Sequence, residues 1–154
     1  MDISQEQVSK VEVDDNGTKS WYLNGKLHRE DGPAIEWSDG TKSWYLNGKH
    51  HREDGPALEY ADGTKSWYLN GKRHRKDGPA IEHAKGTKVW YLNGKYHRED
   101  GPALEYADGT KSWYLNGKEV TEQQVMGKHT LIIDGKEVTL SNKSFNSLKK
   151  FFKG

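Results

Sequence analysis

Four histidines recur at one fixed interval, and three of them are followed closely by adjacent carboxylates such as Glu30-Asp31; the third histidine is followed by Lys76-Asp77. Histidine and carboxylate side chains bind zinc and carry out acid–base catalysis. Zinc ligands must lie within about 2.1 Å of one ion, whereas equivalent residues in a linear array of two-stranded repeats stay about 10 Å apart. The pattern therefore predicts no metal site, no catalytic residues and no cofactor. The recurring histidines are His28, His51, His74 and His97.

The alternative to metal binding and catalysis is a structural role for these residues. We expect each histidine to pack against a tryptophan or to bond to the aspartate of its own loop. Arg29 and its copies sit beside the carboxylates, which predicts a solvated ion-pair network. An active site is normally singular, while these groups occur in four copies, so the sequence indicates a protein that is not an enzyme.

Composition restricts the possible classes further. The chain has no cysteine, which excludes disulfides and thiolate metal sites. Its formal net charge is +1, which gives no general attraction to nucleic acid or to anionic membranes. The 6 Trp and 8 Tyr predict an aromatic core. The N-terminal residues are polar and no apolar run reaches the roughly 18 residues of a membrane span, so we expect a soluble, cytoplasmic protein.

The recurring histidines, carboxylates and aromatic residues belong to an internal repeat, which determines where they lie in the fold. The phrase Gly-Thr-Lys-Ser-Trp-Tyr-Leu-Asn-Gly-Lys begins at Gly17, and the pattern returns every 23 residues. We predict three segments: an entry segment over 1–16 with a partial strand at 11–13, a repeat sheet over 17–118, and a cap over 119–154. The fold class expected is mainly β, an elongated antiparallel β-meander of 23-residue hairpin repeats with a small α/β C-terminal cap.

Two tight turns per repeat set the expected strand register. Asn70-Gly71 and Asp62-Gly63 each predict a two-residue type I′ turn. The first turn pairs Tyr68 with Arg73, and the second pairs Leu58 with Trp67. One face should then carry Leu58, Tyr60, Lys65, Trp67, Leu69 and His74, and the other Ala57, Glu59, Ser66, Tyr68 and Arg73.

The cap has its own signals. Thr121 with Gln124 predicts a capping box, residues 131–139 predict a hairpin, and Ser141 should open a helix that runs through Phe152. We expect this unit to cover the end of the array. An alternative is a membrane or partner contact made by Lys149, Lys150 and Lys153 beside the phenylalanines.

Differences between repeats indicate a recognition surface. The residue after each Asn-Gly-Lys changes from repeat to repeat and should lie beside the repeated tyrosine, and the third repeat is locally basic. Tyrosine and arginine dominate binding hot spots. The predicted partner-binding residues are Tyr22, Leu27, Tyr45, His50, Tyr68, Arg73, Arg75, Lys76, Tyr91 and Tyr96. Neutral variation on a solvent-exposed face is the alternative reading.

The repeats resemble the MORN (membrane occupation and recognition nexus) family, particularly its bacterial and viral variants. The resemblance rests on residues 55–63 and 68–74 and covers about residues 17–118. It implies stacked antiparallel hairpins with a scaffold or recognition role. The sequence motif His-Arg-Glu-Asp-Gly-Pro-Ala is similar to repeats of phage and large-virus proteins. Some bacterial proteins with similar repeats are called antitoxins. The expected function is thus a non-enzymatic phage or mobile-element protein, in the host cytoplasm, that binds and blocks a host defence or toxin protein.

Two alternatives stay open. The repeated tyrosines with nearby Arg and Lys could stack nucleic-acid bases or nucleotides, which the near-neutral charge makes the weaker choice. A lipid-surface scaffold follows from family analogy alone, and the membrane is the partner we expect least.

Overall fold

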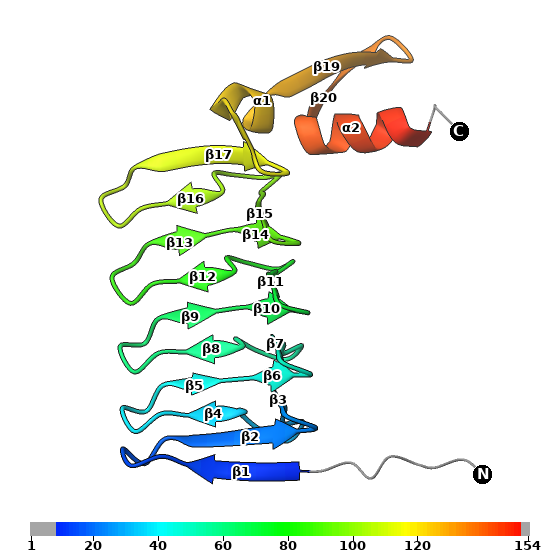
Figure 1. The fold of residues 1–154 in the computed structure, drawn as a ribbon. Helices are drawn as coiled ribbons and strands as arrows, with labels where there is room; N and C mark the ends of the chain where they lie inside the picture. The colour runs from blue at the N-terminus through cyan, green and yellow to red at the C-terminus, as the bar shows by residue number, and fades with distance from the viewer. Residues whose placement is uncertain (1–8, 152–154) are drawn as a thin grey trace, which may run out of the picture.

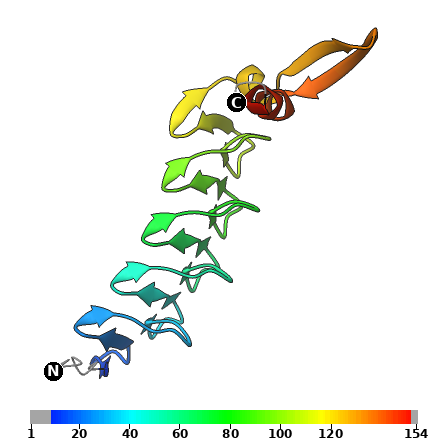
Figure 2. The same cartoon turned by 90° about the vertical axis from the view of Figure 1, so that its right-hand side faces the viewer.

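The structure, a computed structural model, describes residues 9–151. It is mainly β: a 12-stranded antiparallel meander follows the 23-residue period, and a hairpin and a short helix follow it (Figure 1). The repeats succeed one another along one axis (Figure 2). The large sheet contains β1 (Ser9–Val13), β2 (Lys19–Leu23), β3 (Lys26–Leu27), β4 (Ile35–Glu36), β5 (Lys42–Ser43), β8 (Leu58–Glu59), β9 (Lys65–Ser66), β12 (Ile81–Glu82), β13 (Lys88–Val89), β16 (Leu104–Glu105), β17 (Lys111–Leu115) and β18 (Lys118–Val120).

Short hairpins project at one end of each inner repeat (Figure 1). They are β6 (Tyr45–Leu46) with β7 (Lys49–His50), β10 (Tyr68–Leu69) with β11 (Lys72–Arg73), and β14 (Tyr91–Leu92) with β15 (Lys95–Tyr96). The backbone is in strand conformation on both sides of Trp67. The residues before Trp67 pair within the large sheet, and those after it pair within the short hairpin. Neighbouring hairpins are bonded to each other: the Gly71 N–H donates to the His50 carbonyl at 2.8 Å.

The Asn-Gly turns have the predicted form. Asn70 and Gly71 have φ of 50° and 78°, the two positive values that a type I′ turn requires. Tyr68 pairs with Arg73 and Leu69 with Lys72, which confirms the register expected for this hairpin.

The Asp-Gly turns differ from the prediction by one residue. Only Gly63 has positive φ, and the Asp62 carboxylate accepts the Thr64 N–H at 2.8 Å. The Tyr60 N–H donates to the Thr64 carbonyl, which makes a three-residue loop whose glycine forms a bulge. Leu58 therefore pairs with Ser66 and Glu59 with Lys65, so the predicted pairing of Leu58 with Trp67 is wrong.

This one-residue shift exchanges the faces, because successive side chains in a strand point to opposite sides. On one side, which we call face A, an aliphatic residue alternates with a small or β-branched one across nine strands: Ser20, Ile35, Ser43, Leu58, Ser66, Ile81, Val89, Leu104 and Ser112. On the other side, face B, charges alternate: Lys19, Glu36, Lys42, Glu59, Lys65, Glu82, Lys88, Glu105 and Lys111. The expected grouping of Leu58 and Tyr60 with Lys65 and Trp67 is thus incorrect.

Each face has its own packing. On face A, Ile81, Val89, Tyr91 and Leu104 form a buried cluster. On face B, the backbone N–H of Trp67 donates to the carbonyl of the fully buried Ala80, and Trp67 packs against the buried residues. The aromatic contribution to the core is therefore divided between the two sides of the sheet.

The C-terminal unit has α1 (Glu122–Met126), β19 (Lys128–Ile133), β20 (Lys136–Ser141) and α2 (Asn142–Phe151). The Thr121–Gln124 capping box and the hairpin are present as predicted. His129 stacks on Phe145 at a ring separation of 3.9 Å, which fastens the hairpin to α2. Phe152, the predicted last residue of the helix, lies outside the described residues. At the other end, β1 is longer than the partial strand predicted at 11–13.

Candidate functional site

Eight of the ten predicted partner-binding residues come together as one column on face A. Tyr45 and His50 pair across a hairpin with ring centroids 4.1 Å apart, and His50 stacks on Tyr68 at 4.9 Å. The Arg73 guanidinium then lies 5.7 Å and 5.4 Å from the ring centroids of Tyr68 and Tyr91. The tyrosine column, as we call it, comprises Tyr22, Leu27, Tyr45, His50, Tyr68, Arg73, Tyr91, Tyr96, Tyr114 and Glu119.

The column alternates a constant residue with a variable one. Tyr91 and Tyr96 pair across a hairpin at 4.6 Å, and Tyr96 meets Tyr114 of the next hairpin at 5.2 Å. At the ends, Tyr22 pairs with Leu27 and Tyr114 with Glu119. The sequence difference between repeats is therefore presented at a regular interval, between tyrosines that do not change.

The column is half-buried, and a second aromatic row lies beside it. Tyr60 and Tyr106 are 46% and 43% exposed. They follow Leu58 and Leu104 by two residues, so they share face A with the column. Burial raises the pKa of Tyr45 and of Tyr114, and smaller increases come from the phenol of Tyr60 for Tyr45 and from the phenol of Tyr106 for Tyr114. Solvent-exposed tyrosines thus lie along one border of the packed tyrosine column on face A.

Burial and hydrogen bonding fix the ionisation of the column. The Arg73 Nε–H donates to the Tyr68 hydroxyl at 3.0 Å. Burial, followed by a hydrogen bond with Tyr96, raises the pKa of Tyr91 to about 12. Burial also lowers the pKa of His50, so its ring is neutral at neutral pH. The column therefore carries a cation at Arg73 and a neutral ring at His50.

The other two predicted residues, Arg75 and Lys76, lie on face B and are separated from the column. The Arg75 guanidinium sits 3.9 Å above the Trp67 ring and donates to Glu82 at 2.7 Å. Arg29, Arg52 and Arg98 repeat this arrangement and also donate from Nε to the aspartate of their own loops. The ion-pair network was predicted; the stacking of each arginine on a tryptophan was not.

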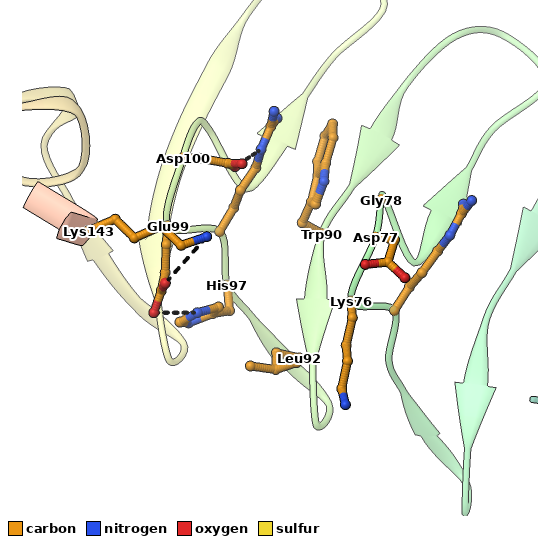
Figure 3. A pocket seen from close by; sticks show the side chains of 11 residues that line it. Lys76, Asp77, Gly78, Trp90, Leu92, His97, Glu99, Asp100 and Lys143 are labelled. Atoms are coloured by element: carbon orange, nitrogen blue, oxygen red, sulfur yellow. Dashed lines mark hydrogen bonds and ion pairs between the residues drawn. The ribbon is translucent and has the colours of Figure 1, made fainter. Parts of the chain in front are cut away.

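Shallow grooves separate the loops on face B. One, about 740 Å³ in volume, lies between the loops of the third and fourth repeats, and Trp90 and Leu92 contribute to its walls (Figure 3). Lys143 of α2 reaches its rim, with Nζ 4.0 Å from Glu99 Oε2 (Figure 3). Two further grooves, one and two repeats earlier, are lined by residues at the equivalent positions, without Lys143. Because they recur with the repeat, these grooves follow from the repeat geometry.

The recurring histidines connect one repeat to the next. The Asn70 N–H donates to His51 Nδ1 at 3.2 Å, and the other three histidines accept from the equivalent asparagine at 3.0–3.2 Å. Their Nε2 atoms face a loop glutamate at 3.5–3.7 Å in three repeats. The predicted bond to the loop aspartate is not what these rings form. In the third repeat Lys76 replaces the glutamate, and within residues 9–151 the buried His74 Nε2 has no hydrogen-bond partner.

Searches for relatives add no identification. No protein-family model matches the chain, and no curated protein matches its sequence. Among residues 9–151, no three His, Asp or Glu side chains gather in a way that could hold a metal ion. No helix in that range has both the length and the hydrophobicity to span a membrane.

Proposed function

We propose that this chain is a non-enzymatic binding protein that engages a protein partner through face A. The observation that carries the proposal is the tyrosine column, in which Leu27, His50, Arg73, Tyr96 and Glu119 alternate with constant tyrosines. Tyrosine and arginine supply large contact areas at a small cost in side-chain entropy, and they dominate protein-binding hot spots. A surface that changes in steps along a rigid sheet suits the recognition of one particular partner.

The more specific proposal concerns the partner. The MORN-like repeat wording supports a phage or mobile-element protein that binds and blocks a host defence or toxin protein, in the cytoplasm of the host. The blocking role rests on the resemblance, whereas the binding role rests on the column and on the open rings of Tyr60 and Tyr106. The blocking role and the binding role can therefore be tested separately.

Base stacking receives less support than protein binding. Nucleic-acid platforms present a free ring face to each base. Here His50 lies between Tyr45 and Tyr68, and Tyr96 lies between Tyr91 and Tyr114, so neighbouring side chains already occupy ring faces. A lipid-surface scaffold has no observation on these faces in its favour.

The test places a photoreactive amino acid at Tyr60 or at Tyr106, and at Lys42 or Lys88 on face B as the matched control. After irradiation in a lysate of the toxin- or defence-bearing host, the adducts are identified by mass spectrometry. Each candidate is then purified and its affinity is measured against the wild type and against Tyr60→Ala/Tyr106→Ala. We expect adducts from face A alone and a loss of affinity of at least ten-fold. Equal labelling from both faces, or unchanged affinity, would reject the use of face A.

A further inference from the structure

The first strand leaves one edge of the large sheet open. All five residues of β1 are exposed, and within residues 9–151 no strand pairs with its outer edge. Val11 and Val13 are 54% and 63% exposed. An open edge of this length is a template for pairing with another strand.

The hydrogen-bond pattern shows which backbone groups point outward. At the first turn the Asp14 N–H donates to the Thr18 carbonyl. In antiparallel pairs, residues bonded to the partner strand alternate with residues that are not. Glu12 and Lys10 are therefore bonded to β2, and the N–H and C=O groups of Ser9, Val11 and Val13 point away from it. Trp21, which pairs with Val11, agrees with this pattern, because its backbone N–H donates to the Ala34 carbonyl on the side of β2 that is turned away from β1.

These outward groups match a second copy of the same strand. If two β1 strands pair antiparallel about Val11, then Val11 faces Val11 of the second copy, and Ser9 faces Val13. Those are the residues with outward groups, so the pairing forms about six backbone hydrogen bonds. In the same register Lys10 of each copy faces Glu12 of the other, and opposite charges across two strands stabilise the pair. Lys10 and Glu12 already form an ion pair within one copy, so both side chains lie on one face.

We propose that the chain forms a two-fold symmetric dimer through β1, in which Lys10 and Glu12 exchange ion pairs between the copies. The axis is perpendicular to the sheet, so face A continues from one copy into the other. The interface is isologous and closes after two chains. This inference does not depend on the proposed function.

A head-to-tail filament is the competing arrangement, and the charges disfavour it. In the array every lysine of face B faces a glutamate; Lys65, for example, faces both Glu59 and Glu82. Strand β1 at the same register would bring Val13 to Lys111 and the Glu12 carboxylate to Ser112. The N-terminal edge thus fits its own copy better than it fits the opposite end of the sheet.

Sedimentation velocity on the full chain, from about 1 μM to about 1 mM, tests the proposal. We expect wild-type dimers within that range. Lys10→Glu places two glutamates opposite each other, and Glu12→Lys places two lysines, so each variant alone should dimerise about ten-fold more weakly. An equimolar mixture of the two should recover dimers, as should the double variant Lys10→Glu/Glu12→Lys.

A backbone variant checks the same pairing without a change of charge. Val11→Pro removes an outward N–H that β2 does not use, so far-UV circular dichroism should be unchanged while the dimer is lost. A wild-type chain that stays monomeric at about 1 mM, species that grow beyond dimers, or single-charge variants that dimerise like the wild type would each overturn the proposal.

Discussion

The alternating row on face A makes a prediction in which one repeat serves as the reference for another. Ser66 is 4% exposed and lies between Leu58 and Ile81. The same position in the next repeat is Val89, which is also buried and lies between Ile81 and Leu104. The substitution Ser66→Val therefore reproduces an arrangement that the chain already contains.

The magnitude follows from buried area. Valine in place of serine buries roughly one to two additional methyl groups, at about 0.8 kcal/mol each, and valine also suits a strand better. Overpacking costs about 1–3 kcal/mol where a core has no room, but Val89 indicates that this row accepts valine between aliphatic neighbours. We expect Ser66→Val to raise the free energy of unfolding by about 1 kcal/mol, and Val89→Ser to lower it by a similar amount. Ser43→Val should gain less, because the Ser43 hydroxyl donates to the Ala57 carbonyl.

Urea unfolding followed by tryptophan fluorescence measures all three variants, and thermal unfolding should move in parallel by about 2–4 °C per kcal/mol. The reasoning is refuted if Ser66→Val destabilises the protein while Val89→Ser leaves it unchanged. That pair of results would mean that the row is not a continuous buried ladder.

Four further predictions test other contacts. Asn70→Thr should destabilise the protein by about 1–2 kcal/mol in urea unfolding, because Asn70 has φ of 50°, where a β-branched residue is strained. Lys76→Glu should raise the melting temperature by restoring a carboxylate beside the unpaired His74 Nε2; no gain would mean that this contact is unimportant. The backbone N–H two residues on lowers the pKa of Asp62, so its stabilisation is present above pH 4 and is lost as the pH falls further; Asp62→Asn should flatten the melting temperature between pH 5 and pH 3. The pKa of Tyr91 is raised to about 12, so its contribution to stability is lost as the pH rises from 10 towards 12; Tyr91→Phe should reduce that loss in alkaline denaturation.

The fold could be predicted from the sequence as far as local turn chemistry determined it. Asn70-Gly71 requires two positive φ angles, and the hairpin register followed from that requirement. Asp62-Gly63 was ambiguous, because the same two letters also suit a three-residue loop in which the aspartate accepts the N–H of Thr64. One extra residue in that loop moved Leu58 from the side of Trp67 to the side of Tyr68.

The candidate site was predicted in part. The tyrosines and the variable residues are in one strand pair, so the Asn-Gly turn alone brought Tyr68 and Arg73 together. Arg75 and Lys76 were grouped with them by charge, although they belong to the loop on face B. The histidine-to-asparagine bonds join residues 19 apart in different repeats, and only the spacing of stacked repeats reveals them. The alternating Lys–Glu row was missed because it depends on the corrected register.

The measurement that tests the two faces most directly uses the absence of native cysteine. In the corrected register Glu59 and Lys65 are opposite each other and do not share ladder hydrogen bonds, so their Cα atoms should be about 4.5 Å apart, within disulfide range. We expect Glu59→Cys/Lys65→Cys to form an intramolecular disulfide readily on mild oxidation, as read by thiol labelling and mass spectrometry, and Glu59→Cys/Ser66→Cys to remain reduced. Preferential oxidation of the second pair would mean that the Asp-Gly turn has two residues, and that the tyrosine column and the aliphatic row lie on opposite sides of the sheet.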